Sequence, residues 1–186
     1  MRRQRLVAAA AEQFHRRGVP ATALADVARG ADVPPGNMFY YFRTKDALAE
    51  AVVADWTARI EASLGELEAA SADPRERLGL LLERAAGRGA NYAAYGCPLA
   101  GIARDLRQMG AEPALAAAPL KRLTAWVERQ LGEAGDGQAA RHALFVVAAL
   151  QGAFVLAHAS DEAAVVDEVR RSLDAWLAGD VARRAG

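Results

Sequence analysis

The stretch GVPATALADVARGADVPPGNMFYYFRTKDAL, residues 18–48, carries the strongest structural signal in this sequence. It predicts two short helices joined by a tight turn at residues 31–33, and the second helix opens at Pro34 and Pro35, where the missing proline N–H does no harm. The side chains expected to lock the two helices together are small or apolar: Val27, Ala28, Val33 and Met38. This pattern is typical of a helix-turn-helix motif, here at about residues 23–42.

Helical periodicity continues on both sides of the motif. Upstream, Leu6, Ala10 and Phe14 predict a helix from about Arg3 that ends at Gly18. Downstream, Thr44 is expected to cap a long helix, and the further helices are expected at about 46–70, 74–94, 98–109, 113–134, 138–159 and 162–179. With no strand pattern, the sequence predicts an all-α protein of about nine helices.

Composition and charge limit the possible functions. The chain is 53% hydrophobic and 25% charged, as expected of a folded globular protein. Its net charge of zero hides an asymmetry: residues 1–47 hold eight Arg and Lys against four acids, so this part carries +4 and the rest −4. A basic N-terminal segment followed by an acidic remainder suggests that the N-terminal segment binds a polyanion. We expect neither a signal peptide nor an apolar stretch as long as a membrane span, and therefore a cytoplasmic protein.

The residues that usually carry metal or catalytic chemistry do not form a pattern. Cys97 is the single cysteine, and the three histidines are scattered without metal-ligand spacing, so we expect no metal and no cofactor. No nucleophile–base pairing, catalytic carboxylate pair or phosphate loop is present, which argues against an enzyme.

The sequence of the helix-turn-helix motif resembles a known family. Residues 18–48 are similar, without gaps, to the DNA-binding domain of the TetR family of transcription regulators, through Gly18, Thr22, Asp26, Val27, Ala28, Ala31, Val33, Gly36, Asn37, Tyr41, Phe42, Lys45 and Leu48. The resemblance implies a three-helix DNA-binding domain at 1–46, a connecting helix at 47–70 and a ligand-binding and dimerisation domain at 71–186.

The resemblance also implies which residues meet DNA. The positions expected at or near phosphates are Thr22, Gly36, Tyr40, Tyr41 and Lys45, and those expected to face the groove are Pro35, Asn37 and Tyr40. Tyrosine hydroxyls and a lysine suit phosphate, and Asn can pair with an adenine edge. The side chains expected to pack inward are Met38, Phe39 and Phe42.

Two departures from the family pattern bear on DNA binding. Pro34-Pro35 stands where Ser-Lys or Ser-Arg usually opens the recognition helix, which removes an N–H and a positive charge. Ala23 stands where a hydroxyl usually caps the preceding helix, unless Thr22 takes that role. We therefore expect weaker binding, or a contribution from a flexible basic arm formed by Arg2, Arg3 and Arg5.

The second half is less informative. The segment YGCPLAGIARDL, residues 95–106, resembles the LmrA-like branch of the family, some of whose members control multidrug efflux genes. The last two helices carry small residues, such as Ala149 and Gly152, that let another helix approach closely. In the family these helices pair with their symmetry mates as a four-helix bundle, which implies a homodimer. The alternative is that they only complete the monomer core.

An effector site is expected between the helices of the second half. The candidate lining is apolar with one polar anchor: Tyr92, Cys97, Met109, Trp126, Phe145, Phe154 and Gln151. Taken singly, each of these residues is better explained by a plain role in the core. Cys97 as a thiol sensor is a weaker hypothesis, because no basic residue lies within five positions of it.

The sequence thus predicts a cytoplasmic homodimeric repressor that binds double-stranded operator DNA and releases it when a small hydrophobic effector shifts the conformational population. Four alternatives remain open: a transcriptional activator, a repressor with no small ligand, a helical adaptor without DNA binding or effector, and, least favoured, a helical enzyme.

Overall fold

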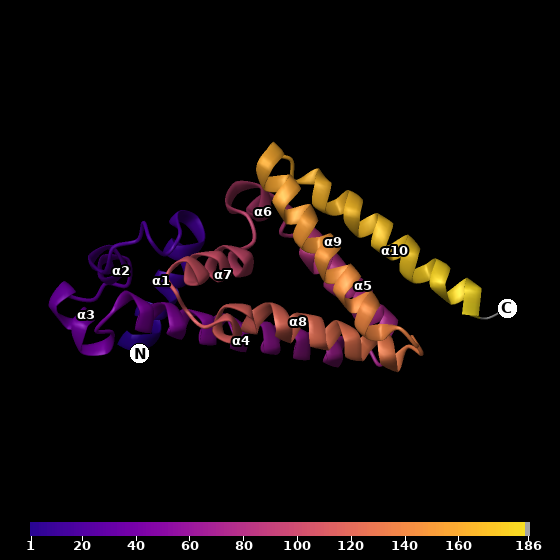
Figure 1. The fold of residues 1–186 in the computed structure, drawn as a ribbon, viewed down its shortest axis with the longest axis horizontal. Helices are drawn as coiled ribbons and strands as arrows, with labels where there is room; N and C mark the ends of the chain where they lie inside the picture. The colour runs from indigo at the N-terminus through magenta and orange to yellow at the C-terminus, as the bar shows by residue number, and fades with distance from the viewer. Residues whose placement is uncertain (185–186) are drawn as a thin grey trace. The chain divides into compact units, whose positions relative to one another are not determined.

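The computed structural model describes the backbone of residues 1–184 and the side chains of residues 1–179 (Figure 1). All regular secondary structure in this part of the chain is helical. The helices are α1 (Arg2–Arg17), α2 (Leu24–Gly30), α3 (Pro35–Tyr41), α4 (Lys45–Ala70), α5 (Pro74–Ala86), α6 (Gly89–Tyr95), α7 (Pro98–Gln108), α8 (Pro113–Glu133), α9 (Ala139–Ser160) and α10 (Ala164–Arg184). The prediction of an all-α protein is confirmed.

The described residues hold ten helices where the sequence predicted about nine. The difference lies in the segment expected as one helix at 74–94, which divides into α5 and α6. α5 ends at Ala86, and Gly87 and Arg88 form the turn before α6 begins at Gly89. Two glycines so close together weaken a helix, because glycine loses more backbone freedom than other residues when it becomes helical.

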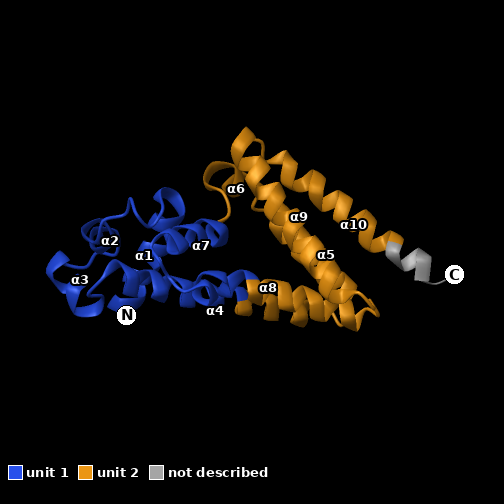
Figure 2. Cartoon of the chain, viewed as in Figure 1, with its two compact units in different colours: residues 1–60, 98–120 blue, residues 61–97, 121–186 orange. Residues whose placement is uncertain are grey.

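The chain forms two compact units (Figure 2). Unit 1 comprises residues 1–60 and 98–120, and unit 2 comprises residues 61–97 and 121–186. The units group residues by contact, so they do not test the predicted functional division at residues 46 and 70, which stays a prediction.

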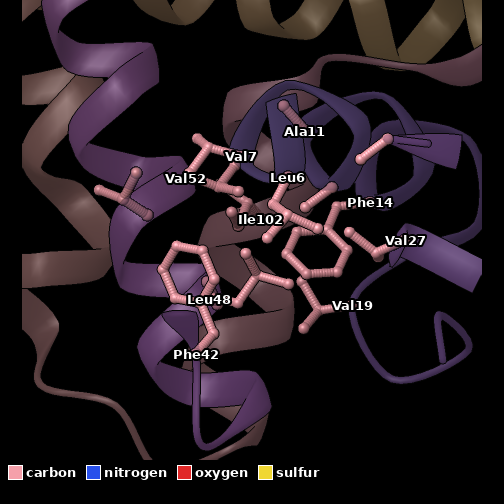
Figure 3. Packing of buried hydrophobic residues seen from close by; sticks show 14 of the residues in the cluster. Leu6, Val7, Ala11, Phe14, Val19, Val27, Phe42, Leu48, Val52 and Ile102 are labelled. Atoms are coloured by element: carbon pink, nitrogen blue, oxygen red, sulfur yellow. The ribbon is translucent and has the colours of Figure 1, made fainter. Parts of the chain in front are cut away.

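Unit 1 is built around one apolar core (Figure 3). The inward face of α1, with Leu6 and Phe14, repeats at helical spacing. Side chains from α2, α4, α7 and the end of α3 converge on it in Figure 3: Val27, Leu48, Val52, Ile102 and Phe42. Val27, Ala28, Val33 and Met38 are all buried, as the sequence predicted. This packing fixes α2 and α3 against α1, so the outer surface of α3 has a defined position within unit 1.

In unit 2, α9 packs against α6 and α10, and α10 also packs against α5 and α6. The buried side of α9 includes Val146, Leu150, Phe154 and Ala157. Its other side leaves large apolar side chains in solvent: Leu144, Phe145, Val155 and Leu156. Unit 2 therefore presents an apolar surface along α9, which we call the α9 face and define by these four residues.

By length and composition alone, α9 also passes as a membrane span. It is 22 residues long with a mean hydropathy of 1.8 over its most apolar window, and 39% of that window is buried. The sequence pattern predicted no segment of this kind. α9 qualifies because it is apolar on both its buried and its exposed sides, a property that it shares with core and interface helices of soluble proteins.

Candidate nucleic-acid interface and effector site

Helix α3 presents a polar outer surface. It begins at Pro35, and Met38 turns inward and is buried, while Pro35, Gly36, Asn37 and Tyr40 are exposed. Tyr40 is 84% exposed, and its ring meets Tyr41 edge to face with 5.1 Å between centroids. α3 thus offers an amide and a phenol side by side to a partner outside the protein.

Phe39 departs from expectation. It was expected to pack inward with Met38 and Phe42, but it is 59% exposed, whereas Met38 and Phe42 are buried. The reason is geometric: α3 has only two turns, and its successive residues point about 100° apart. Once Met38 faces the core, its neighbour Phe39 points away from it.

The turn between α2 and α3 is held by Arg5. The Arg5 guanidinium donates to the carbonyl oxygens of Ala31 and Asp32, and its Nη2 lies 3.1 Å from Asp32 Oδ2. Asp32 sits in the left-handed region with φ of 50°, which a short polar side chain tolerates. Arg5 therefore closes the turn from which the recognition helix starts.

The predicted flexible basic arm is wrong. Helix α1 begins at Arg2, so the first arginines are helical. Arg5 binds the turn, and the Arg3 guanidinium lies 5.0 Å from the centroid of the Phe42 ring. Arg3 and Arg5 are held because the turns that flank α3 contact the N-terminal end of α1, which the sequence pattern did not reveal.

Thr22 is not exposed. It is 1% accessible, and its hydroxyl donates to the Gly18 carbonyl oxygen at 2.8 Å. The suggestion that Thr22 caps α2 is wrong, because Ala23 occupies the N-cap and no side chain caps it. The hydroxyl instead fixes the loop between α1 and α2. Thr22 can therefore contact a phosphate only through its backbone, or after the hydrogen bond to Gly18 is broken.

Lys45 binds the same loop. Its ammonium donates to the carbonyl oxygens of Val19, at 3.1 Å, and Pro20, at 2.9 Å. An ammonium has three protons, so these two bonds leave one donor for a phosphate. Thr44, next to it, accepts from the Ala47 N–H at 3.1 Å and so caps α4 as the sequence predicted.

Asp105 of α7 holds this loop from its other side. It is 2% exposed, and its Oδ2 accepts from the Val19 N–H at 2.8 Å, while Oδ1 binds Arg104. Gly18 has φ of +82°, and a Cβ there would lie 2.9 Å from Asp105 Oδ2. Glycine is therefore required at position 18. Sequence reasoning missed Asp105, although an acid on the apolar side of α7 between Ile102 and Leu106 was a usable signal.

In unit 2, the structure brings two of the effector candidates together. The rings of Tyr92 on α6 and Phe154 on α9 stack with 3.8 Å between centroids. Burial, and to a smaller extent Cys97, raises the pKa of Tyr92 above its usual 10.0. Gln151, one turn before Phe154, has a buried Oε1 that accepts no hydrogen bond from the described residues. Half-buried Cys97 follows α6.

The remaining candidates lie elsewhere. Met109 belongs to unit 1 and is 36% exposed, and Phe145 lies on the α9 face, 49% exposed, against Trp176. Trp126 is buried on α8 and donates from Nε1 to Glu68 at 2.6 Å. Within unit 2, ring contact thus joins only the pair Tyr92 and Phe154 of the predicted set. Among the described residues, no cluster of three or more His, Cys, Asp or Glu side chains could hold a metal.

A short helix with exposed polar groups, braced by two apolar helices and closed turns, defines a helix-turn-helix regulator. The comparisons agree: residues 6–52 match the family described as "Bacterial regulatory proteins, tetR family". Comparison with curated proteins gives no significant match. The profile match identifies a TetR-type DNA-binding domain at residues 6–52, and the solved structures show that the chain has the fold of TetR regulators. Together these findings support a DNA-binding transcriptional regulator.

Solved structures share the whole fold. A TetR transcriptional regulator from Chloroflexus aurantiacus is 20% identical with a TM-score of 0.82, over 95% of this chain and 94% of that one. One from Legionella pneumophila is 20% identical with a TM-score of 0.81, over 91% and 94%. A third structure, titled "Molecular basis for control of antibiotic production by a bacterial hormones", is 26% identical with a TM-score of 0.72, over 94% of both chains. The LmrA-like assignment stays a prediction.

Proposed function

We propose that this regulator is an effector-responsive repressor that binds operator DNA as a homodimer. The observation that carries the proposal is the outer surface of α3, where Asn37 and Tyr40 are exposed on a helix fixed from behind by Met38. An exposed amide on such a helix suits the adenine edge in a major groove, and a phenol suits phosphate.

Within this proposal the predicted contacts divide into two groups. The exposed residues Pro35, Gly36, Asn37 and Tyr40 meet the DNA directly, with half-buried Tyr41 at their edge. The Thr22 and Lys45 side chains shape the loop between α1 and α2, and Lys45 has one donor left for a phosphate. Their loss would weaken binding through the loop as well as through any direct contact.

The homodimer is supported by the α9 face. Large apolar side chains that stay exposed along a helix are typical of a protein–protein interface. A single recognition helix reads few bases, whereas a dimer engages two half-sites about 34–36 Å apart or multiples of this. TetR family regulators bind operator DNA as dimers and are soluble cytoplasmic proteins, which supports the same assignment here.

Effector binding in unit 2 is supported by the stacked pair Tyr92 and Phe154 beside the unsatisfied Gln151 Oε1. Aromatic walls with one polar group suit a small hydrophobic molecule carrying a donor. A similar fold occurs in the protein whose title describes control of antibiotic production by bacterial hormones. Effector binding would shift the population away from the conformation that fits the operator.

A gel-shift series on the DNA upstream of the regulator's own gene tests the proposal. With about 6–10 phosphate contacts, affinity should fall about 10³–10⁵-fold between about 50 and 200 mM salt. Asn37→Ala should cost about 1–3 kcal/mol of operator discrimination and leave thermal stability unchanged. Gln108→Ala, an exposed change on α7, is the matched control. A folded dimer that binds no DNA even at low salt would contradict the proposal and favour the adaptor function.

A further inference from the structure

A hollow lies between α4 and α8 within unit 2. Its volume is about 230 Å³, and its floor consists of Leu64, Gly65, Ala125 and Trp126. Gly65 of α4 and Ala125 of α8 both line the hollow, and their small side chains leave the space unfilled. A Cβ on Gly65 would contact nothing within 4 Å, so the space above this glycine is open.

The hollow is not part of the predicted effector site. On the other side of α4, Arg84 of α5 donates to the Ser63 carbonyl oxygen at 3.1 Å and also binds Glu66. Helical periodicity places Gly65 roughly opposite Ser63, so the hollow opens on the side of α4 that α5 does not cover. Of the predicted effector residues, only Trp126 lines it.

Two ion pairs close the hollow at its ends. Glu61 and Arg122 meet at 2.9 Å between Oε1 and Nε, and Glu68 pairs with Arg129. All four side chains are between one third and two thirds exposed. Ion pairs this exposed to water contribute little, so an incoming charged group can exchange with a partner at small cost.

The two ends differ in the hydrogen-bonding capacity that they leave unused. Glu68 Oε1 already accepts from both Trp126 Nε1 and Arg129, which fixes the indole beside the floor. Arg122 uses its Nε on Glu61, and its two terminal amino groups have no partner among the described residues. These two amino groups form a planar fork that fits a carboxylate.

We propose that this hollow is a binding site for a small planar carboxylic acid. The ring of the acid lies on Gly65 and Ala125 beside the Trp126 indole, and its carboxylate meets the Arg122 terminal amino groups. Drug-sized ligands fill about 300–1,000 Å³, so a volume of about 230 Å³ suits an acid of one or two rings. An amine is disfavoured because it would compete with Arg122 for Glu61 and with two donors for Glu68.

Isothermal titration of the full-length protein with 2-naphthoate, 2-naphthamide and 2-naphthamidine tests the chemistry, because the three share a ring system and differ in charge. No DNA is present, so a negative result leaves the proposed operator binding untouched. We expect the acid to bind about tenfold or more tightly than the neutral amide, and the amidine to bind no better than the amide. Equal binding of all three, amidine preference or no binding of the acid would overturn the proposal.

Variants locate the site. Gly65→Leu fills the hollow and should abolish naphthoate binding, while Gly79→Leu, at another open helical glycine on α5, should not. Arg122→Gln should weaken binding about tenfold, while Arg59→Gln, which removes an arginine from an exposed ion pair on α4, should leave it unchanged. Circular dichroism checks folding, and Gly65→Ala replaces the leucine variant if that one misfolds. Unchanged affinity in both the position-65 variant and Arg122→Gln would overturn the assignment.

Discussion

Units 1 and 2 differ in how the groups at their surfaces are partnered. In unit 1, charged side chains close the turns of the backbone: Arg5 binds the Ala31 carbonyl, Lys45 the Val19 carbonyl and Asp105 the Val19 amide. In unit 2, the α9 face leaves large apolar side chains in water. In unit 1, side chains of the unit itself thus hydrogen-bond the backbone groups of its loops, and α3 offers a small polar surface. Unit 2 instead has an apolar surface that a partner chain would cover.

The largest effect that separates the two units should come from Leu156→Glu. Because Leu156 is exposed, the charge costs little in the isolated chain, but in a dimer it would be buried without a partner. We expect dimer dissociation to become about thirtyfold or more easier, with operator affinity falling in parallel. Analytical ultracentrifugation over a concentration series measures the first effect and a gel shift the second.

Ala69→Glu, at an exposed alanine near the end of α4, is the matched control and should leave the dimer intact. A Leu156→Glu protein that sediments like the wild type would show that the α9 face is not the dimer interface. The contrast between the two units would then need another explanation.

The second test removes one of the bonds that close the loop in unit 1. Asp105→Ala leaves the Val19 N–H buried without an acceptor, which should lower the free energy of unfolding by about 1–3 kcal/mol. Asp105→Asn keeps an acceptor oxygen and should lose less. Urea unfolding of the two variants measures the difference, and equal losses would show that the Val19 bond is not the source of the effect.

The smallest effect concerns alkaline pH and unit 2. Burial raises the pKa of Tyr92 in the folded protein, so its contribution to stability is fully present below about pH 10 and is lost as pH rises through the raised pKa. Tyr92→Phe cannot ionise and should lose less stability between about pH 8 and pH 10.5. Urea unfolding at both pH values measures this, with Tyr40→Phe, at an exposed tyrosine, as the control. An identical pH dependence of Tyr92→Phe and wild type would contradict it.

The DNA-binding half was predictable because its signals are local. Gly18 ends α1, Pro35 opens α3, and the apolar residues between them repeat at helical spacing. The errors at Phe39 and Thr22 are local and concern where a single side chain lies, whereas the missed Asp105 and the expected flexible arm concern pairs that are distant in sequence. Asp105 lies 86 positions from Val19, and Arg5 lies 26 from Ala31, so no local pattern could have joined them.

The effector site was harder to predict for a related reason. Helical periodicity shows which side of a helix is apolar, but not whether another helix covers it. Phe145 and Phe154 both read as apolar residues of α9, yet Phe145 is exposed and Phe154 stacks on Tyr92. The stacked pair needed the α6–α9 contact, which no pattern within either helix contains.

The close approach of Gly18 to the Asp105 carboxylate has a consequence for protein engineering. Two separate restraints act on position 18, a backbone with positive φ and a carboxylate oxygen where a Cβ would stand. In a library randomised at positions 18 and 105, shortening the acid would relieve only the second restraint. We expect the variants that still fold to retain glycine at position 18, whichever residue replaces Asp105. Position 105 should therefore tolerate substitution, whereas position 18 should not.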